Sequence, residues 1–117
     1  MKPINTKAHG VLDYLSVGLL CALPRALGWS PRVTNLLTAS AAGTLVYSLL
    51  TRYELGVVRV LPMKAHLGLD AASGASLCLA PLCVPDEPET VRAALLGLGL
   101  FELAVTLSSQ SKPFQEG

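Results

Sequence analysis

The chain is 117 residues long, which is the size of one domain with one core. Charged residues make up 15% of it, against about 25% in soluble domains, and hydrophobic residues make up 51%. A formal net charge of +1 and an aromatic content of 5% provide neither the basic footprint nor the stacking surface of a nucleic-acid-binding protein.

Four apolar runs follow one another along the chain, at residues 8–27, 33–50, 65–84 and 91–108. Each is 18 to 20 residues long, and a helix needs about 20 residues to cross the hydrocarbon core of a bilayer. The second run has no charged residue and the others have one or two each, whereas a helix of a soluble bundle carries a charged face. We therefore expect an all-α fold, a four-helix transmembrane bundle that forms a single membrane domain over residues 1–117.

The charges between the runs predict an orientation. Six cationic residues flank the runs on one side: Lys2, Lys7, Arg52, Arg59, Lys64 and Lys112. Three lie on the other side: Arg25, Arg32 and Arg92. The positive-inside rule then predicts that both termini are cytoplasmic. Trp29 and Tyr53 fit interfacial anchors at opposite faces of the membrane.

An internal repeat is the strongest signal in the chain. The stretch 7–13 returns as 64–70, so that Lys-Ala-His followed by Asp occurs twice. His9 and Asp13, like His66 and Asp70, are four residues apart, which places both side chains on one face of a helix. The chain thus divides into two tandem two-helix repeats, about 7–54 and about 64–110.

The two repeats are expected to insert in the same orientation, because each contains two helices. A pseudo-twofold axis along the membrane normal would then relate them, as in parallel transporter repeats. With a two-residue gap, the second helices align Tyr47 with Glu102 and Thr51 with Thr106.

The repeated Lys-x-His-x-x-x-Asp pattern with a following proline resembles the SPW-repeat family of small bacterial integral membrane proteins. The intervening stretches 47–56 and 61–66 share this resemblance. The Ser-Pro-Trp motif itself is degenerate, since the matching positions are Leu23-Pro24-Arg25 and Ala80-Pro81-Leu82. The resemblance implies a four-helix protein of the bacterial inner membrane and brings no established activity with it.

Polar side chains gather at one depth in the cytoplasmic half of the predicted bundle. Six functional side chains fall there: His9, Asp13, Tyr47, His66, Asp70 and Glu102. Four hydroxyl-bearing residues are expected to support them: Thr51 and Thr106 just below, and Ser16 and Ser73 one turn deeper. A carboxylate at the centre of a spanning helix costs about 2.5–3.5 kcal/mol on insertion scales. The three carboxylates are therefore expected to face inward and find partners.

Three interpretations of this cluster stay open. In the first, the cluster is a structural network in which each histidine donates to the aspartate one turn away. In the second, it is a proton or ion conduit in a homo-oligomer. Alternatively it is the site of a metal- or haem-binding redox subunit. The metal candidates are His9, Asp13, His66, Asp70 and Glu102, and the haem axial candidates are His9 and His66.

The catalytic motifs with known signatures are missing from the chain, so we expect a structural or ligand-binding role rather than an enzyme. The expected partners are the lipid bilayer and a second copy of the chain or another membrane protein; no nucleic-acid partner is expected.

Overall fold

The computed structural model describes residues 2–112, and these form four helices and no β-strand. The helices are α1 (Thr6–Ala26), α2 (Pro31–Leu49), α3 (Met63–Cys83) and α4 (Glu89–Leu107). Each lies within a few residues of a predicted apolar run. The prediction of an all-helical, four-helix chain is therefore confirmed.

Helices α1 and α2 begin at a capping side chain, whereas α3 and α4 each begin after a proline and have no side-chain cap. The side chain of Asn5 accepts a hydrogen bond from the backbone N–H of Ala8 at the start of α1. Ser30 caps α2 in the same way, and Pro31 occupies its first position. After α1 the chain turns at Gly28, whose φ of 67° is in the left-handed region that favours glycine.

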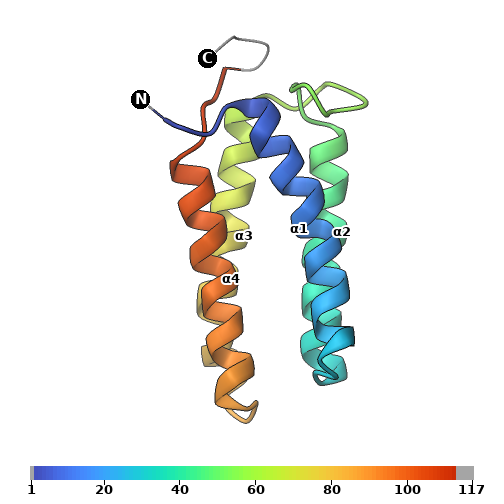
Figure 1. Cartoon of the computed structure of the whole chain (residues 1–117), viewed down its shortest axis with the longest axis vertical. Coiled ribbons are helices and arrows are strands. Elements are labelled where there is room, and N and C mark those ends of the chain that lie inside the picture. The colour runs from blue at the N-terminus through green and yellow to red at the C-terminus, as the bar shows by residue number, and fades with distance from the viewer. Residues whose placement is uncertain (1, 113–117) are drawn as a thin grey trace.

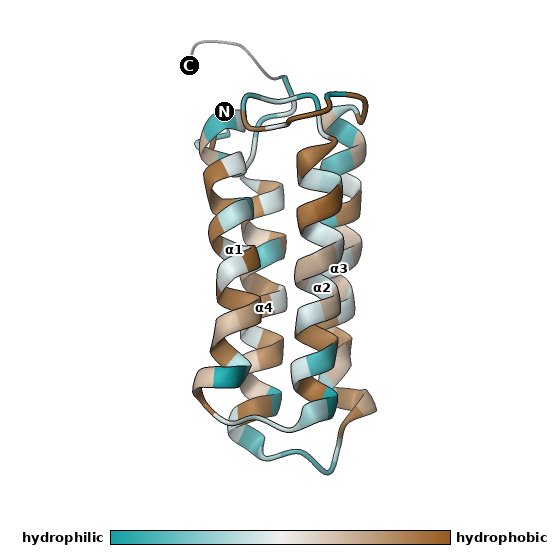
Figure 2. Ribbon diagram, turned by 90° about the vertical axis from the view of Figure 1, so that its right-hand side faces the viewer, coloured by the Kyte–Doolittle hydropathy of each residue, from teal (hydrophilic) through white to brown (hydrophobic). Residues whose placement is uncertain are grey.

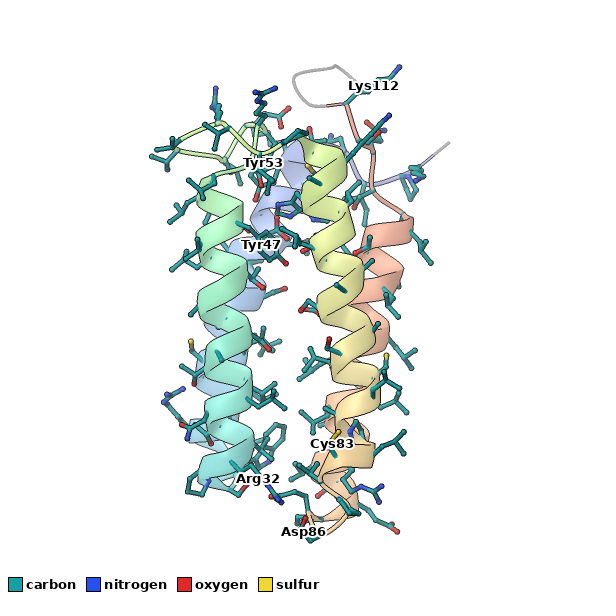
Figure 3. The ribbon with its side chains drawn as sticks, turned by 180° about the vertical axis from the view of Figure 1, so that it is seen from behind. Arg32, Tyr47, Tyr53, Cys83, Asp86 and Lys112 are labelled. Atoms are coloured by element: carbon teal, nitrogen blue, oxygen red, sulfur yellow. The ribbon has the colours of Figure 1, made fainter. Side chains whose placement is uncertain are left out.

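The four helices form two hairpins, α1 with α2 and α3 with α4, and both termini lie at the same end of the molecule (Figure 1). A hydrophobic core joins the hairpins in the half farther from the termini: Leu20, Val33, Leu37, Ala41, Leu77, Ala80, Val84, Val91 and Leu95. Beyond this core, Arg32 of the first hairpin contacts Asp86 at 2.9 Å and Glu87 at 2.7 Å in the turn of the second (Figure 3). The half nearer the termini contains the polar cluster instead.

The helix bounds repeat along the chain. α3 follows α1 at an offset of 57 residues at both ends (Thr6 to Met63, Ala26 to Cys83). α4 follows α2 at an offset of 58 (Pro31 to Glu89, Leu49 to Leu107). The turn between α3 and α4 is therefore one residue longer than the turn between α1 and α2.

This offset shows that the gapped alignment from the sequence is wrong by three residues in the second helices. Buried residues of α2 and α4 correspond at an offset of 58: Val33 with Val91, Leu37 with Leu95, and Ser48 with Thr106. Glu102 therefore matches Thr44, and Tyr47 matches Val105. The alignment shortened the second repeat by two residues before its second helix. The turn at that place is in fact one residue longer than its counterpart in the first repeat.

Large apolar side chains cover the outside of the helices, and the strongly hydrophilic residues lie mostly toward the two ends (Figure 2). Leu15, Leu82 and Leu107 are 64%, 72% and 75% exposed. Among the described helices, one is long and apolar enough to span a membrane: α4, of which only 22% of the apolar window is buried inside the molecule. The other three described helices do not meet this criterion.

Candidate metal site

Two histidines and two aspartates meet between the hairpins. His9 and Asp13 come from α1, and His66 and Asp70 come from α3. All four side chains are buried, the histidines at 1% and 0% exposure. The spacing of four residues places each pair on one face of its helix, and the crossing of α1 and α3 brings the two faces together.

Each histidine contacts the aspartates of both repeats. The Nε2 atom of His9 lies 2.7 Å from Asp70 Oδ2 and 3.2 Å from Asp13 Oδ1. The Nε2 atom of His66 lies 3.0 Å from Asp13 Oδ2 and 3.1 Å from Asp70 Oδ2. One potential ligand atom from each residue lies within 4.8 Å of the other three. The shortest contact of His9 is thus with the aspartate of the other repeat, not with the one a turn away.

Hydroxyl groups fix the orientation of both imidazole rings. Ser109 Oγ lies 2.6 Å from His9 Nδ1, and Thr51 Oγ1 lies 2.7 Å from His66 Nδ1. Ser109 donates its hydrogen to the backbone carbonyl of Val105, and Thr51 donates to that of Tyr47. Because each hydroxyl has already donated, it accepts from the ring, so both Nδ1 atoms carry hydrogen and both Nε2 atoms face the carboxylates. Metal-ligating histidines are held in this way.

One buried nitrogen in the cluster lacks a hydrogen bond. His66 Nε2 is within 3.1 Å of two carboxylate oxygens. The angles at these atoms are nevertheless unsuitable, so it has no hydrogen-bond partner among the described residues. A buried nitrogen is rarely left unpaired. The nitrogen lies between the two carboxylates rather than in line with one oxygen, and from this position it could ligate an ion held by the same carboxylates.

Two tyrosines complete the cluster (Figure 3). Tyr47 OH donates to Asp70 Oδ1 at 2.5 Å, and Tyr53 OH donates to Asp13 Oδ2 at 2.7 Å. Both rings pack against His66, with centroid distances of 4.8 and 5.2 Å. Each carboxylate therefore keeps one hydrogen bond to a phenol and leaves its remaining lone pairs toward the histidines.

The prediction that Tyr53 is an interfacial anchor is wrong, because Tyr53 is fully buried. Burial and the charge of Asp13 raise the pKa of Tyr53, so it remains a donor. The tight turn after α2 places it. In that turn, Gly56 approaches the carbonyl of Thr51 so closely that a Cβ atom there would lie 1.9 Å from the oxygen. Helical periodicity contains no signal for Tyr53, since it lies outside the helices.

The other predicted polar residues have mixed outcomes. Thr51 supports His66 as expected, whereas Thr106 donates to the backbone carbonyl of Glu102 and does not contact a histidine. The residue that supports His9 is Ser109, two positions beyond α4, which the sequence did not indicate. The three-residue error in the sequence alignment explains this, because the helix bounds match Thr51 with Ser109 at an offset of 58 and not with Thr106.

Glu102 lies apart from the four-residue group. Its Oε2 accepts a hydrogen bond from Ser73 at 3.1 Å. A cavity of about 20 Å³ borders both Glu102 and the cluster. Its polar lining consists of His9, Asp13, Ser16, Thr44, Asp70, Glu102 and Thr106.

The geometry does not favour a haem. The rings of His9 and His66 meet edge to face with centroids 5.2 Å apart, and both aspartates lie against their Nε2 atoms. The adjacent cavity of about 20 Å³ is the size of a water molecule, not of a macrocycle.

Comparison of the chain with protein-family models, with curated proteins and with solved structures finds no match. Function is therefore argued from the site itself, and the resemblance to the SPW-repeat family stays a prediction.

Proposed function

We propose that this chain is a small integral membrane protein that binds one divalent transition-metal ion between its hairpins, through His9, Asp13, His66 and Asp70. The observation that carries the proposal is their convergence within 4.8 Å, with His66 Nε2 buried and without a hydrogen bond among the described residues. The Nδ1 hydrogen bonds to Thr51 and Ser109 support it.

The donor atoms favour a particular class of ion. Two imidazole nitrogens and two carboxylate oxygens suit Mn²⁺, Fe²⁺, Co²⁺ or Zn²⁺, whereas Ca²⁺ and Mg²⁺ prefer oxygen alone and Cu⁺ prefers sulfur. Two carboxylates and a divalent cation sum to zero charge. Two protonated histidines would balance the same carboxylates, so the ion would take the place of two protons at this buried position.

We propose that all four helices cross the membrane, with the cation-rich end in the cytoplasm and a pseudo-twofold axis along the membrane normal. Helices of 19 to 21 residues are about 28–32 Å long, which matches the hydrocarbon core. The exposed leucines and valines along the helices support this placement. Membership of the SPW-repeat family belongs to the same proposal.

Metal analysis of the purified protein tests the site. After loading with Mn²⁺, Fe²⁺, Co²⁺ or Zn²⁺ in detergent and removal of free ion, we expect about one equivalent of at least one of them per chain, and a loss of it in His66→Gln. Ser76→Ala, which changes an exposed residue of α3, is the control and should retain the ion. A folded wild-type protein that retains none of the four ions refutes the proposal.

Thiol labelling tests the membrane placement. Cys83 is exposed at the end of the molecule opposite to Lys112 (Figure 3). A membrane-impermeant maleimide should label it from outside intact cells stripped of their outer membrane, and should not label Cys83→Ser at that position. Lys112→Cys in a Cys83→Ser background should react only after lysis. Recovery of the protein in the soluble fraction without detergent contradicts membrane insertion.

A further inference from the structure

The surroundings of the proposed metal site differ on its two sides. His66 is enclosed by the side chains of Thr51, Tyr47 and Tyr53, and it does not line the cavity. His9, Asp13 and Asp70 do line it. A metal held by the four residues is therefore closed on the side of His66 and faces a cavity on the other side.

The cavity has the size and the polarity for a water molecule. Its volume of about 20 Å³ exceeds the 10–15 Å³ or so that one water needs. A buried water also needs two to four polar partners. Beyond the metal ligands, the lining offers the carboxylate of Glu102 and the hydroxyls of Ser16, Thr44 and Thr106.

Two hydroxyl groups that line the cavity already donate their hydrogens elsewhere, so they can only accept from a group in the cavity. Thr106 donates to the carbonyl of Glu102, and Thr44 donates to Tyr47 OH at 3.4 Å. Their oxygens, like the Glu102 carboxylate, are left as acceptors. A water that binds a cation through its oxygen has two hydrogens to donate and is a poor acceptor, so it is complementary to a lining of acceptors.

We propose that the metal ion keeps one coordination position open toward this cavity, and that a water molecule occupies it and donates a hydrogen bond to Glu102. This inference rests on the proposed metal site. In a structural metal site, protein residues fill every coordination position. The proposed site instead belongs with those that keep one position open for water or a small oxygen ligand. Glu102 then has a role at the site without being a ligand.

Electron spin echo measurements on the Mn²⁺-loaded protein, in water enriched in oxygen-17, test both proposals separately. Couplings to histidine nitrogen report the metal site, and coupling to oxygen-17 reports a coordinated water. We expect both in the wild type. Ser16→Leu fills the cavity and should lose the oxygen-17 coupling while the nitrogen couplings remain. Ser76→Leu makes the same change on an exposed face of α3 and should keep both.

The outcomes are distinguishable. Absence of nitrogen couplings in the wild type refutes the metal site itself. Nitrogen couplings without oxygen-17 coupling overturn the open position alone, as does a Ser16→Leu variant that keeps its coordinated water. If Ser16→Leu does not fold, Val105→Leu fills the same cavity from α4 and takes its place in the comparison.

Discussion

Replacing Thr51 with valine tests whether the His66 ring is held as a metal ligand. Thr51 is fully buried, and its hydroxyl lies 2.7 Å from His66 Nδ1 while donating to the carbonyl of Tyr47. Valine keeps the shape of the side chain and removes the acceptor, so the Nδ1 hydrogen loses its partner and the ring loses its orientation. Loss of such an outer partner weakens metal binding about 10–100-fold, or about 1.4–2.7 kcal/mol.

The assay is a competition between the purified protein and a chelator of known affinity, followed by the metal bound at equilibrium. Thr34→Val is the matched control, because its hydroxyl donates to the carbonyl of Trp29 at the far end of α2. Ser109→Ala should weaken binding by a similar factor through His9. Unchanged affinity in Thr51→Val, or an equal loss in Thr34→Val, would show that the hydroxyl does not orient a ligand.

Three further predictions follow from the same contacts. His9→Ala and His66→Ala should reduce metal content to the same extent, because the two occupy corresponding positions; one silent variant beside a defective one contradicts a shared site. Tyr53→Phe should lower the free energy of unfolding by about 1.5–3 kcal/mol, since it removes a buried hydrogen bond to a carboxylate, and Tyr14→Phe, whose acceptor is a neutral carbonyl, should cost less in the same denaturant titration. Arg32 lowers the pKa of the two acidic residues that it contacts. A lowered pKa in the folded state means that this contribution to stability is present above the ordinary values of 3.8 and 4.5 and is lost as the pH falls below them. The difference in melting temperature between wild type and Arg32→Gln should therefore shrink on acidification, and a difference that grows would contradict the assignment.

The cluster could be predicted from the sequence as far as its geometry is local. A histidine and an aspartate four residues apart share a helix face whatever the rest of the fold does, and the repeat makes the pair occur twice. That His9 contacts Asp70 more closely than Asp13 depends on how α1 crosses α3. Crossing geometry depends on packing along the whole helix, which one local pattern does not determine.

The residues that the sequence missed lie outside the helices. Tyr53 reaches Asp13 from the turn after α2, and Ser109 reaches His9 from the segment after α4. Periodicity describes helix faces and is silent about such positions. The turn before α4 is one residue longer than the turn before α2, whereas the alignment had shortened this part by two residues, so it paired Glu102 with Tyr47 instead of Thr44.

The placement of four helices in a membrane stays a prediction, because one described helix, α4, qualifies as a span on length and hydropathy. Small and hydroxyl-bearing residues are frequent in the other three, and they reduce the mean hydropathy of a helix without adding charge. Such residues also allow helices to pack closely, as Gly74 and Gly99 do where a Cβ on Gly99 would lie 2.6 Å from the carbonyl oxygen of Gly74. Small and hydroxyl-bearing residues therefore lower the mean hydropathy of these helices while allowing close helix packing.

The equal division of the cluster between the hairpins has a consequence for how such a site can vary. One hairpin contains a single histidine and a single aspartate of the four, so a free hairpin would have to associate with a second copy to complete the four-residue cluster. In this chain, the segment 50–62 connects the two hairpins covalently and fixes their effective concentration. Assembly of the cluster therefore does not depend on the concentration of the protein. Because the two hairpins belong to one chain, their sequences also need not be identical. A residue beside the cluster in one hairpin can change without the same change in the other, as with Thr44 and Glu102 at corresponding positions beside the cavity.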